Sequence, residues 1–213
     1  MSNVKEMWDN RYSSNEYAYG MAPNMFFKEA VGRFKLAGNI LLPAEGEGRN
    51  AIYAAQNGLL VTAFDISKEG KKKALKLAAQ QNVEIVYEVG DFLKLDLVNH
   101  NYDSAALIFA HFPPDLLSIY HKKIAEMVKP GGLIILEGFS KNHSEYQKKH
   151  PNIGGPKNKD ILFSKEMIRN DFLDFEVIQL EVVETELEEG LYHRGKGSVI
   201  QFVGRKTNAF ERE

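Results

Sequence analysis

Short apolar segments alternate with helical patterns across residues 39–138, and this alternation restricts the fold more than any other feature of the chain. The apolar segments predict strands over residues 39–42, 59–65, 83–89, 104–109 and 133–136. Helices are expected between them, at about 49–57, after the capping residue Ser67, and after Pro113-Pro114. Because strands and helices that alternate in this way form βαβ units, we expect a parallel sheet with right-handed crossovers.

The last third of the chain has a different pattern. Residues 141–159 are polar and contain glycines and prolines, which is typical of a long loop that forms a lid. A short helix is expected at about 164–170. Strands over 175–185 and 198–205 are joined by a glycine-containing connection and predict an antiparallel pair.

The first 38 residues predict two helices, at about 4–12 and 24–34, which would cap the strand ends. The 213 residues suit a single domain with one buried core. We divide it into an N-terminal helical cap (1–38), a βα core (39–138), and a region with the lid loop, short helix and terminal β-pair (139–213).

Composition excludes several classes of protein. The net charge of -2 opposes nucleic-acid binding driven by bulk electrostatics. The chain has no cysteine, so disulfides and thiolate metal sites are excluded, and no metal-ligand spacing is evident. Neither an apolar signal region nor an apolar run long enough to span a membrane is present. We expect a cytoplasmic monomer or homodimer.

The strongest local motif lies between the first strand and its helix, where the chain reads Glu45-Gly46-Glu47-Gly48-Arg49-Asn50-Ala51. Glycines allow a sharp turn and let a ligand approach the main chain closely. The helix that follows offers free N–H groups at its start. The alternative is a tight connection in which the glycines serve only the turn.

Two acidic residues follow the next two strands. Asp65 ends the second strand about 20 residues after the glycines, where a carboxylate can accept both ribose hydroxyls. Asp91 follows the third strand and could accept from an adenine amino group, with Phe92 against the ring. The structural alternatives are that Asp65 caps the next helix, that Asp91 is a turn residue and that Phe92 is a core aromatic. Since open α/β sheets bind ligands at the carboxyl ends of their strands, the three positions together favour a nucleotide-like ligand.

These motifs resemble those of the class I S-adenosylmethionine-dependent methyltransferases, and most closely a bacterial branch similar to the tellurite-resistance and thiopurine methyltransferases. The resemblance rests on residues 46–50, 61–67, 90–92 and 129–132, and on Trp8, Arg11-Tyr12, Tyr19-Gly20 and Pro23-Asn24. It implies a Rossmann-like, seven-stranded, mostly parallel sheet with an antiparallel last strand and helices on both faces. It also implies methyl transfer from S-adenosylmethionine, with S-adenosylhomocysteine as product.

The resemblance assigns cofactor contacts at the carboxyl ends of four strands. The residues are Glu45, Gly46, Glu47, Gly48, Asn50, Asp65, Ile66, Asp91, Phe92, Phe109 and Ala110. One position departs from the wider family, in which an acidic residue stands two before the first small residue of the loop. Here Leu42 and Pro43 occupy that region, and we expect Glu45 to take over part of the polar role or to contact the methionine ammonium.

By the same resemblance the fourth strand ends beside the sulfonium. His111 is the evident base near that point, and the segment lacks the Asn/Asp-Pro-Pro-aromatic signature of enzymes that methylate amino groups of nucleic-acid bases. His111 is therefore the predicted catalytic residue, with a local structural histidine as the alternative. The candidates for the acceptor pocket are Trp8, Tyr19, Tyr192, His193 and Arg194.

The expected acceptor is a small molecule. A soft sulfur, selenium or tellurium nucleophile would need no base, whereas a hydroxyl or ammonium group would have to lose a proton. Two other functions fit parts of the sequence. An NAD(P)-dependent oxidoreductase would use the loose Gly46-x-Gly48-x-x-Ala51 pattern and the Tyr192-x-x-x-Lys196 pair. A protein that binds the cofactor without catalysis would suit the atypical loop.

Overall fold

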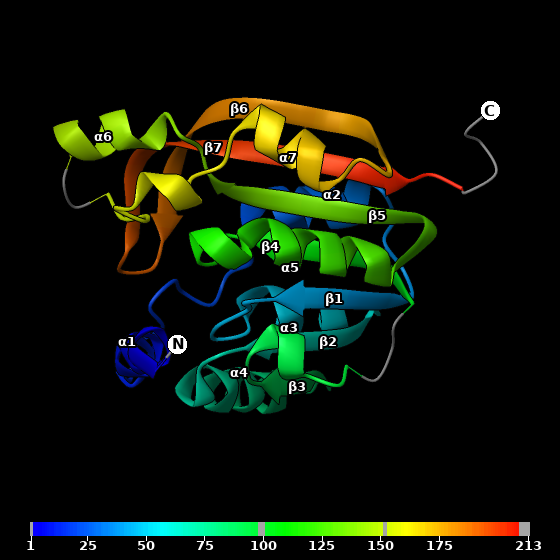
Figure 1. Cartoon of the computed structure of the whole chain (residues 1–213). Coiled ribbons are helices and arrows are strands. Elements are labelled where there is room, and N and C mark those ends of the chain that lie inside the picture. The colour runs from blue at the N-terminus through cyan, green and yellow to red at the C-terminus, as the bar shows by residue number, and fades with distance from the viewer. Residues whose placement is uncertain (1, 98–100, 151–152, 209–213) are drawn as a thin grey trace.

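A seven-stranded sheet in the order β3-β2-β1-β4-β5-β7-β6 forms the centre of the protein in the computed structural model, which describes residues 2–97, 101–150 and 153–208 (Figure 1). Pairing is parallel from β3 to β5, and β7 runs antiparallel between β5 and β6. The strands are β1 (Asn39–Pro43), β2 (Leu60–Asp65), β3 (Val86–Val89), β4 (Tyr102–Ile108), β5 (Val128–Phe139), β6 (Phe175–Glu189) and β7 (His193–Lys206). The predicted fold class is confirmed.

Helices cover both faces of this sheet. One face packs against α2 (Met25–Arg33), α3 (Arg49–Gln56) and α4 (Lys68–Gln80). The other packs against α5 (Pro114–Met127) and α7 (Lys165–Asp171). The central strand β1 is apolar because both of its faces are covered, and Ile40, Leu41 and Leu42 are fully buried. Each contributes about 1.5–3 kcal/mol to the free energy of unfolding.

The register of the strands aligns the predicted motifs at one edge of the sheet. Pro43 of β1 pairs with Phe64 of β2, and Asp65 pairs with Val89 of β3. The chain segments that leave β1, β2 and β3 therefore begin side by side. Figure 1 shows α1 (Ser2–Tyr12) and the turn of the β6–β7 hairpin at this same end of the sheet, where β1 ends.

The prediction of a continuous loop over residues 141–159 was wrong. Helix α6 (His143–Lys149) lies within it, and a short 3-10 helix (Lys159–Ile161) ends it. His143 connects α6 to the sheet, because its Nδ1 accepts from the Ser198 amide at 3.3 Å and its Nε2 lies 3.1 Å from the Gly154 carbonyl oxygen. These tertiary contacts stabilise a helix of only seven residues, which is too short to be stable alone.

The terminal hairpin is longer than expected. β6 and β7 remain paired up to Glu189 and His193, whereas the sequence predicted strands that end at 185 and begin at 198. Pairing across the hairpin continues beyond residue 185, since Glu186 pairs with Lys196 and Glu188 pairs with Arg194. The extension carries Glu189 and His193 back to the edge of the sheet where the ligand motifs lie.

Candidate active site

The glycine loop makes the predicted sharp turn. Ala44, Gly46 and Gly48 all have positive φ angles, of 51°, 62° and 91°. A Cβ atom on Gly48 would lie 2.6 Å from the Cβ of Ala74, so this glycine also permits close packing of α4 against the loop. Gly48 therefore serves both the turn and the packing of α4, and close approach of a ligand to the loop stays a prediction.

Glu45 has a structural role that the sequence did not predict. Its Oε1 accepts from the amides of Asn50 and Ala51, at 2.8 and 2.7 Å, and so caps the start of α3. Burial raises the pKa of this carboxyl group to about 7. The carboxylate occupies helix-start N–H groups that would otherwise be free for a ligand.

Asp65 connects the loop to the start of α4. One oxygen accepts from the Gly46 amide at 3.0 Å and the other from the Ser67 amide at 2.8 Å. Burial raises the pKa of Asp65 to about 6. Each carboxylate oxygen has a further lone pair, so Asp65 can accept hydroxyl groups without losing these bonds. Asp65 therefore offers the kind of acceptor that a pair of hydroxyl groups requires.

The other predicted loop residues contact the N-terminal region. Glu47 accepts from the Ala18 amide at 2.7 Å and forms an ion pair with Lys73. Asn50 is buried and accepts from the Asn24 amide at 2.9 Å. Ile66 lies between Asp65 and Ser67 and is half-buried.

Helix α1 covers the glycine loop, which the sequence indicated only as a general cap. The Tyr12 ring is buried, stacks on Trp8 at 5.4 Å between centroids, and lies against Gly46. Asp9 holds the helix in place, because its Oδ1 accepts from the Ser67 hydroxyl at 2.6 Å and the Lys68 amide at 2.9 Å. A ligand that approaches the Gly46 backbone must share this space with Tyr12 or displace it.

Asp91 and Phe92 take the structural roles. Asp91 accepts from the Tyr120 hydroxyl at 2.8 Å and caps a 3-10 helix over Phe92–Lys94. Phe92 is 2% exposed and stacks on Phe64 at 4.8 Å. Its ring therefore packs in the core rather than facing an open ligand site.

Aromatic rings gather at the carboxyl end of β4. Phe109 has a φ of 52°, an uncommon conformation for a residue with a side chain and one often found at functional sites. Its ring lies 4.5 Å from the His193 ring, which lies 4.5 Å from the Tyr19 ring. The Tyr192 ring is 6.0 Å from Tyr19. The following residue, Ala110, is 1% exposed and belongs to the core.

Arg11 joins this ring cluster to α1. Its guanidinium lies 4.9 Å from the Trp8 ring centroid and 4.6 Å from that of Tyr192, and it donates to the Tyr19 hydroxyl at 2.8 Å. Four of the five predicted acceptor-pocket residues are thus brought together, namely Trp8, Tyr19, Tyr192 and His193. Arg11 itself was not assigned a role from the sequence.

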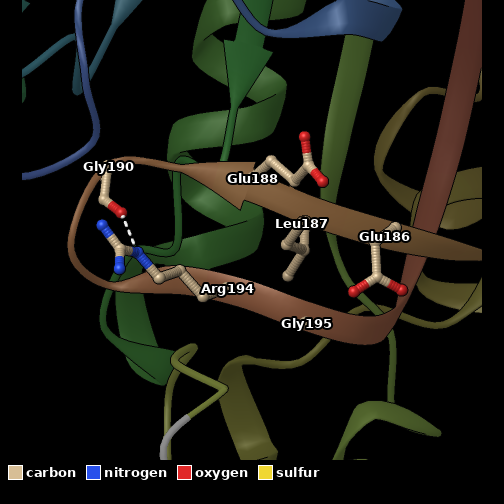
Figure 2. Close-up of a pocket in the computed structure, with 6 residues that line it drawn as sticks. All are labelled: Glu186, Leu187, Glu188, Gly190, Arg194 and Gly195. Atoms are coloured by element: carbon tan, nitrogen blue, oxygen red, sulfur yellow. Dashed lines mark hydrogen bonds between the residues drawn. The ribbon is translucent and has the colours of Figure 1, made fainter.

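Arg194 lies apart from the ring cluster. Its Nε donates to the Gly190 carbonyl oxygen at 2.6 Å, and it lines an open hollow made by the end of the β6–β7 hairpin (Figure 2). Arg194 is exposed whereas the preceding His193 is buried. Adjacent residues of a strand face opposite ways, so one strand presents His193 to the site and Arg194 to the hairpin surface.

The arrangement of His111 opposes its predicted role as a general base. Its Nε2 accepts from the Phe139 amide at 3.0 Å, which leaves Nδ1 to donate to the Ile161 carbonyl oxygen at 2.7 Å. Burial lowers the pKa of His111 to about 3. The imidazole is neutral, has no free nitrogen, and connects the end of β4 to β5 and to the 3-10 helix.

A buried polar network lies beneath the ring cluster and was not predicted. Glu189 forms an ion pair with Arg49 at 2.9 Å and accepts from the Asn24 amide side chain at 3.1 Å. Asn24 also donates to Glu137 at 2.6 Å, and Gln201 donates to Glu137 at 2.7 Å. The one available signal was the position of Arg49, a charged residue at the start of an otherwise buried helix.

The described part of the chain contains no helix long and apolar enough to cross a membrane. Within the same residues, no group of three or more histidine, aspartate or glutamate side chains is arranged to hold a metal ion.

Comparison with known proteins gives one match in sequence and many in structure. Residues 40–132 match the model of a methyltransferase domain. No curated protein matches the chain in sequence.

Among solved structures, magnesium protoporphyrin IX methyltransferase from Synechocystis, solved with bound S-adenosylhomocysteine, is similar at a TM-score of 0.70, with 16% identity over 97% of this chain and 99% of that one. TehB from Haemophilus influenzae gives a TM-score of 0.69, with 17% identity over 95% of this chain and 67% of that one. A structure concerning the conversion of a disulfide bond into a thioacetal group during echinomycin biosynthesis gives a TM-score of 0.78. Its sequence identity is 18%, over 98% of this chain and 94% of that one.

The similarity in structure establishes the fold, and the sequence match establishes the kind of domain on the strands that carry the glycine loop and Asp65. Residues 40–132 therefore match a methyltransferase domain, and the seven-stranded sheet has the fold of the methyltransferase structures to which the chain is similar.

Proposed function

We propose that the enzyme transfers the methyl group of S-adenosylmethionine to a small-molecule acceptor held against the ring cluster of Tyr19, Phe109 and His193. The proposal rests on one observation. The residues proposed to bind the cofactor and those proposed to bind the acceptor lie next to each other on one edge of the sheet. The glycine loop and Asp65 follow β1 and β2, the ring cluster follows β4, and β1 pairs directly with both β2 and β4.

The cofactor would be held by Gly46 and Asp65, at the carboxyl ends of β1 and β2. Gly46 offers a backbone that lacks a Cβ atom, and Asp65 offers free lone pairs. Bound at this edge, the cofactor supplies a methyl group on a positively charged sulfur that is already a good leaving group. The protein then has to align the acceptor and exclude water, which the packed rings do.

The hairpin argues against the oxidoreductase alternative. A Tyr-x-x-x-Lys pair needs a helix to present both side chains together. Here Tyr192 lies in the turn after β6, and Lys196 lies on β7, where it pairs with Glu184.

Calorimetry of the full chain tests the cofactor class. S-adenosylhomocysteine should bind and NAD should not. Asp65→Asn should weaken S-adenosylhomocysteine binding at least about tenfold, since a lost charged hydrogen bond costs roughly 1.5–3 kcal/mol.

Asp103→Asn is the matched control for this experiment. Asp103 also accepts from a backbone amide, that of Asn39 at 2.8 Å, but at the amino end of β1. Its variant should bind normally. NAD binding without S-adenosylhomocysteine binding would overturn the proposal. A panel of small hydroxyl, amine, thiol, selenite and tellurite compounds then identifies the acceptor, and cofactor binding with no methyl transfer to any of them would favour the non-catalytic alternative.

A further inference from the structure

His193, the first residue of β7, is oriented by a carboxylate. Its Nδ1 lies 2.8 Å from Oε2 of Glu189, and the imidazole is 4% exposed. Glu189 is itself fixed, because the same oxygen pairs with Arg49 and the other accepts from Asn24. A carboxylate only accepts, so Nδ1 carries the proton and Nε2 carries the lone pair.

The Nε2 atom of His193 has no hydrogen-bond partner within residues 2–97, 101–150 and 153–208. Around the imidazole ring stand the rings of Tyr19 and Phe109, both at 4.5 Å between centroids, and of Phe139 at 5.1 Å. A base with one nitrogen fixed by a carboxylate and the other free is the arrangement that accepts a proton from a bound molecule.

The other buried histidines lack this combination. Both ring nitrogens of His111 and of His143 are engaged. His121 pairs with Asp171 at 2.7 Å, but its free Nε2 is sealed in the core between Phe163 and Phe172. Among the histidines that the structure describes, His193 is the one whose ring lies against Phe109.

We propose that His193 is the general base of the methyl transfer, oriented by Glu189 as a positioning residue, and that the acceptor is a hydroxyl or ammonium group. This inference rests on the proposed function and narrows its acceptor class. An acceptor that is already an anion has no proton to lose and would not need the Glu189–His193 pair.

The step conserves atoms and charge. The acceptor X–H gives its proton to Nε2, and the electron pair of X forms a bond to the methyl carbon. The bond from that carbon to sulfur breaks with its pair remaining on sulfur. The products are X–CH₃, S-adenosylhomocysteine and a protonated His193, stabilised by Glu189 until the proton passes to solvent.

Burial favours a neutral His193 ring before reaction. Burial lowers the pKa of His193, and Glu189 opposes that shift. Burial alone would raise the pKa of Glu189, but hydrogen bonds from His193 and Arg49 lower it to about 2, so the carboxylate stays charged. The titratable and charged groups that face the ring are Tyr19, Arg11, Arg49, Glu189, His111 and His143.

NMR of the ¹⁵N-histidine-labelled full chain with excess S-adenosylhomocysteine tests the orientation without any acceptor. The His193 signals are assigned by their loss in His193→Asn, in which the amide can still donate to Glu189. We expect the Nδ1–H form of the neutral ring, with Nε2 unprotonated. A neutral ring protonated at Nε2 would overturn the inference. Absence of S-adenosylhomocysteine binding would instead overturn the proposed function.

Kinetics supply the second readout, with catechol as a hydroxyl probe, benzylamine (an ammonium ion at neutral pH) as an amine probe and 4-nitrothiophenolate as an anion that needs no base. His193→Asn should lower turnover of the hydroxyl or amine probe by roughly 100-fold or more, with S-adenosylhomocysteine affinity within about twofold of the parent. Turnover within about threefold of the parent, or turnover of the thiolate alone, would contradict the proposal.

Glu189→Gln should shift the acid limb of the pH–rate profile to lower pH, because the carboxylate stabilises the imidazolium. A merely structural Glu189 would leave that limb in place. The control is His150→Asn, which replaces an exposed histidine and should change neither the profile nor the rate.

Discussion

The Tyr12 ring lies against the Gly46 backbone so closely that a Cβ atom at position 46 would be 2.6 Å from the tyrosine hydroxyl oxygen. The glycine loop, at which the cofactor is proposed to bind, is therefore covered by α1. This contact links the first helix of the chain to ligand binding, and it has consequences that can be measured.

Binding of S-adenosylhomocysteine should change the fluorescence of Trp8, the single tryptophan of the chain. Trp8 stacks on Tyr12, so any displacement of Tyr12 alters its environment. Titration of the full chain should give an emission change that saturates with the calorimetric affinity, while NAD gives none. Calorimetric binding with unaltered Trp8 emission would mean that α1 stays in place.

Asp9→Ala should lower the free energy of unfolding by about 0.5–2 kcal/mol, because Asp9 accepts from amides at the start of α4 as a helix cap does. Urea denaturation measures the change. Glu6→Ala is the control, since Glu6 is exposed on the same helix and its loss should change stability by less than about 0.5 kcal/mol. Equal effects of the two variants would show that Asp9 does not anchor α1.

His111 should make the protein less stable as pH falls below about 6.5. The unfolded chain takes up a proton near its ordinary pKa, whereas the folded pKa is about 3, so the unfolded state binds more protons between these values. The contribution is roughly 1.4 kcal/mol per pH unit in that window. His143 and His193, whose pKa values are also lowered by burial, act in the same direction.

Urea denaturation between about pH 4 and about pH 7 checks this prediction, because this range lies largely between the folded and unfolded pKa values of His111. His111→Asn should be less stable at neutral pH, because the Phe139 and Ile161 backbone groups lose their partner, and it should show a shallower loss of stability with acid. His150→Asn should behave like the parent chain. An unchanged slope in His111→Asn would mean that His111 titrates normally in the folded protein.

Arg49→Met should destabilise the fold by roughly 3–5 kcal/mol, because it leaves Glu189 buried without its cation. Lys196→Met removes the partner of Glu184 from an exposed ion pair and should lower the free energy of unfolding far less, because solvent screens an exposed pair. Both free energies of unfolding come from chemical denaturation at pH 7. Similar costs for the two variants would show that the Arg49–Glu189 pair is solvated rather than buried.

The amino-acid sequence alone determined the sheet and the edge at which ligand binding is proposed. Runs such as 104–109 are apolar throughout because both faces of their strands are covered, and Gly46, Gly48 and Asp65 mark strand ends through local backbone requirements. These features depend on neighbours in the chain, so periodicity and turn residues reveal them. The family resemblance added the antiparallel last strand, which the structure confirms.

The tertiary structure alone decided which side chains are free to do chemistry. His111 and His193 look equivalent in sequence, yet the first has both nitrogens bound to backbone groups 28 and 50 residues away, and the second pairs with Glu189 across a turn. Likewise Glu45 caps a helix and Tyr12 covers Gly46. The partners of His111, the rings around His193 and the contact of Tyr12 with Gly46 come from segments distant along the chain, and no local pattern encodes them.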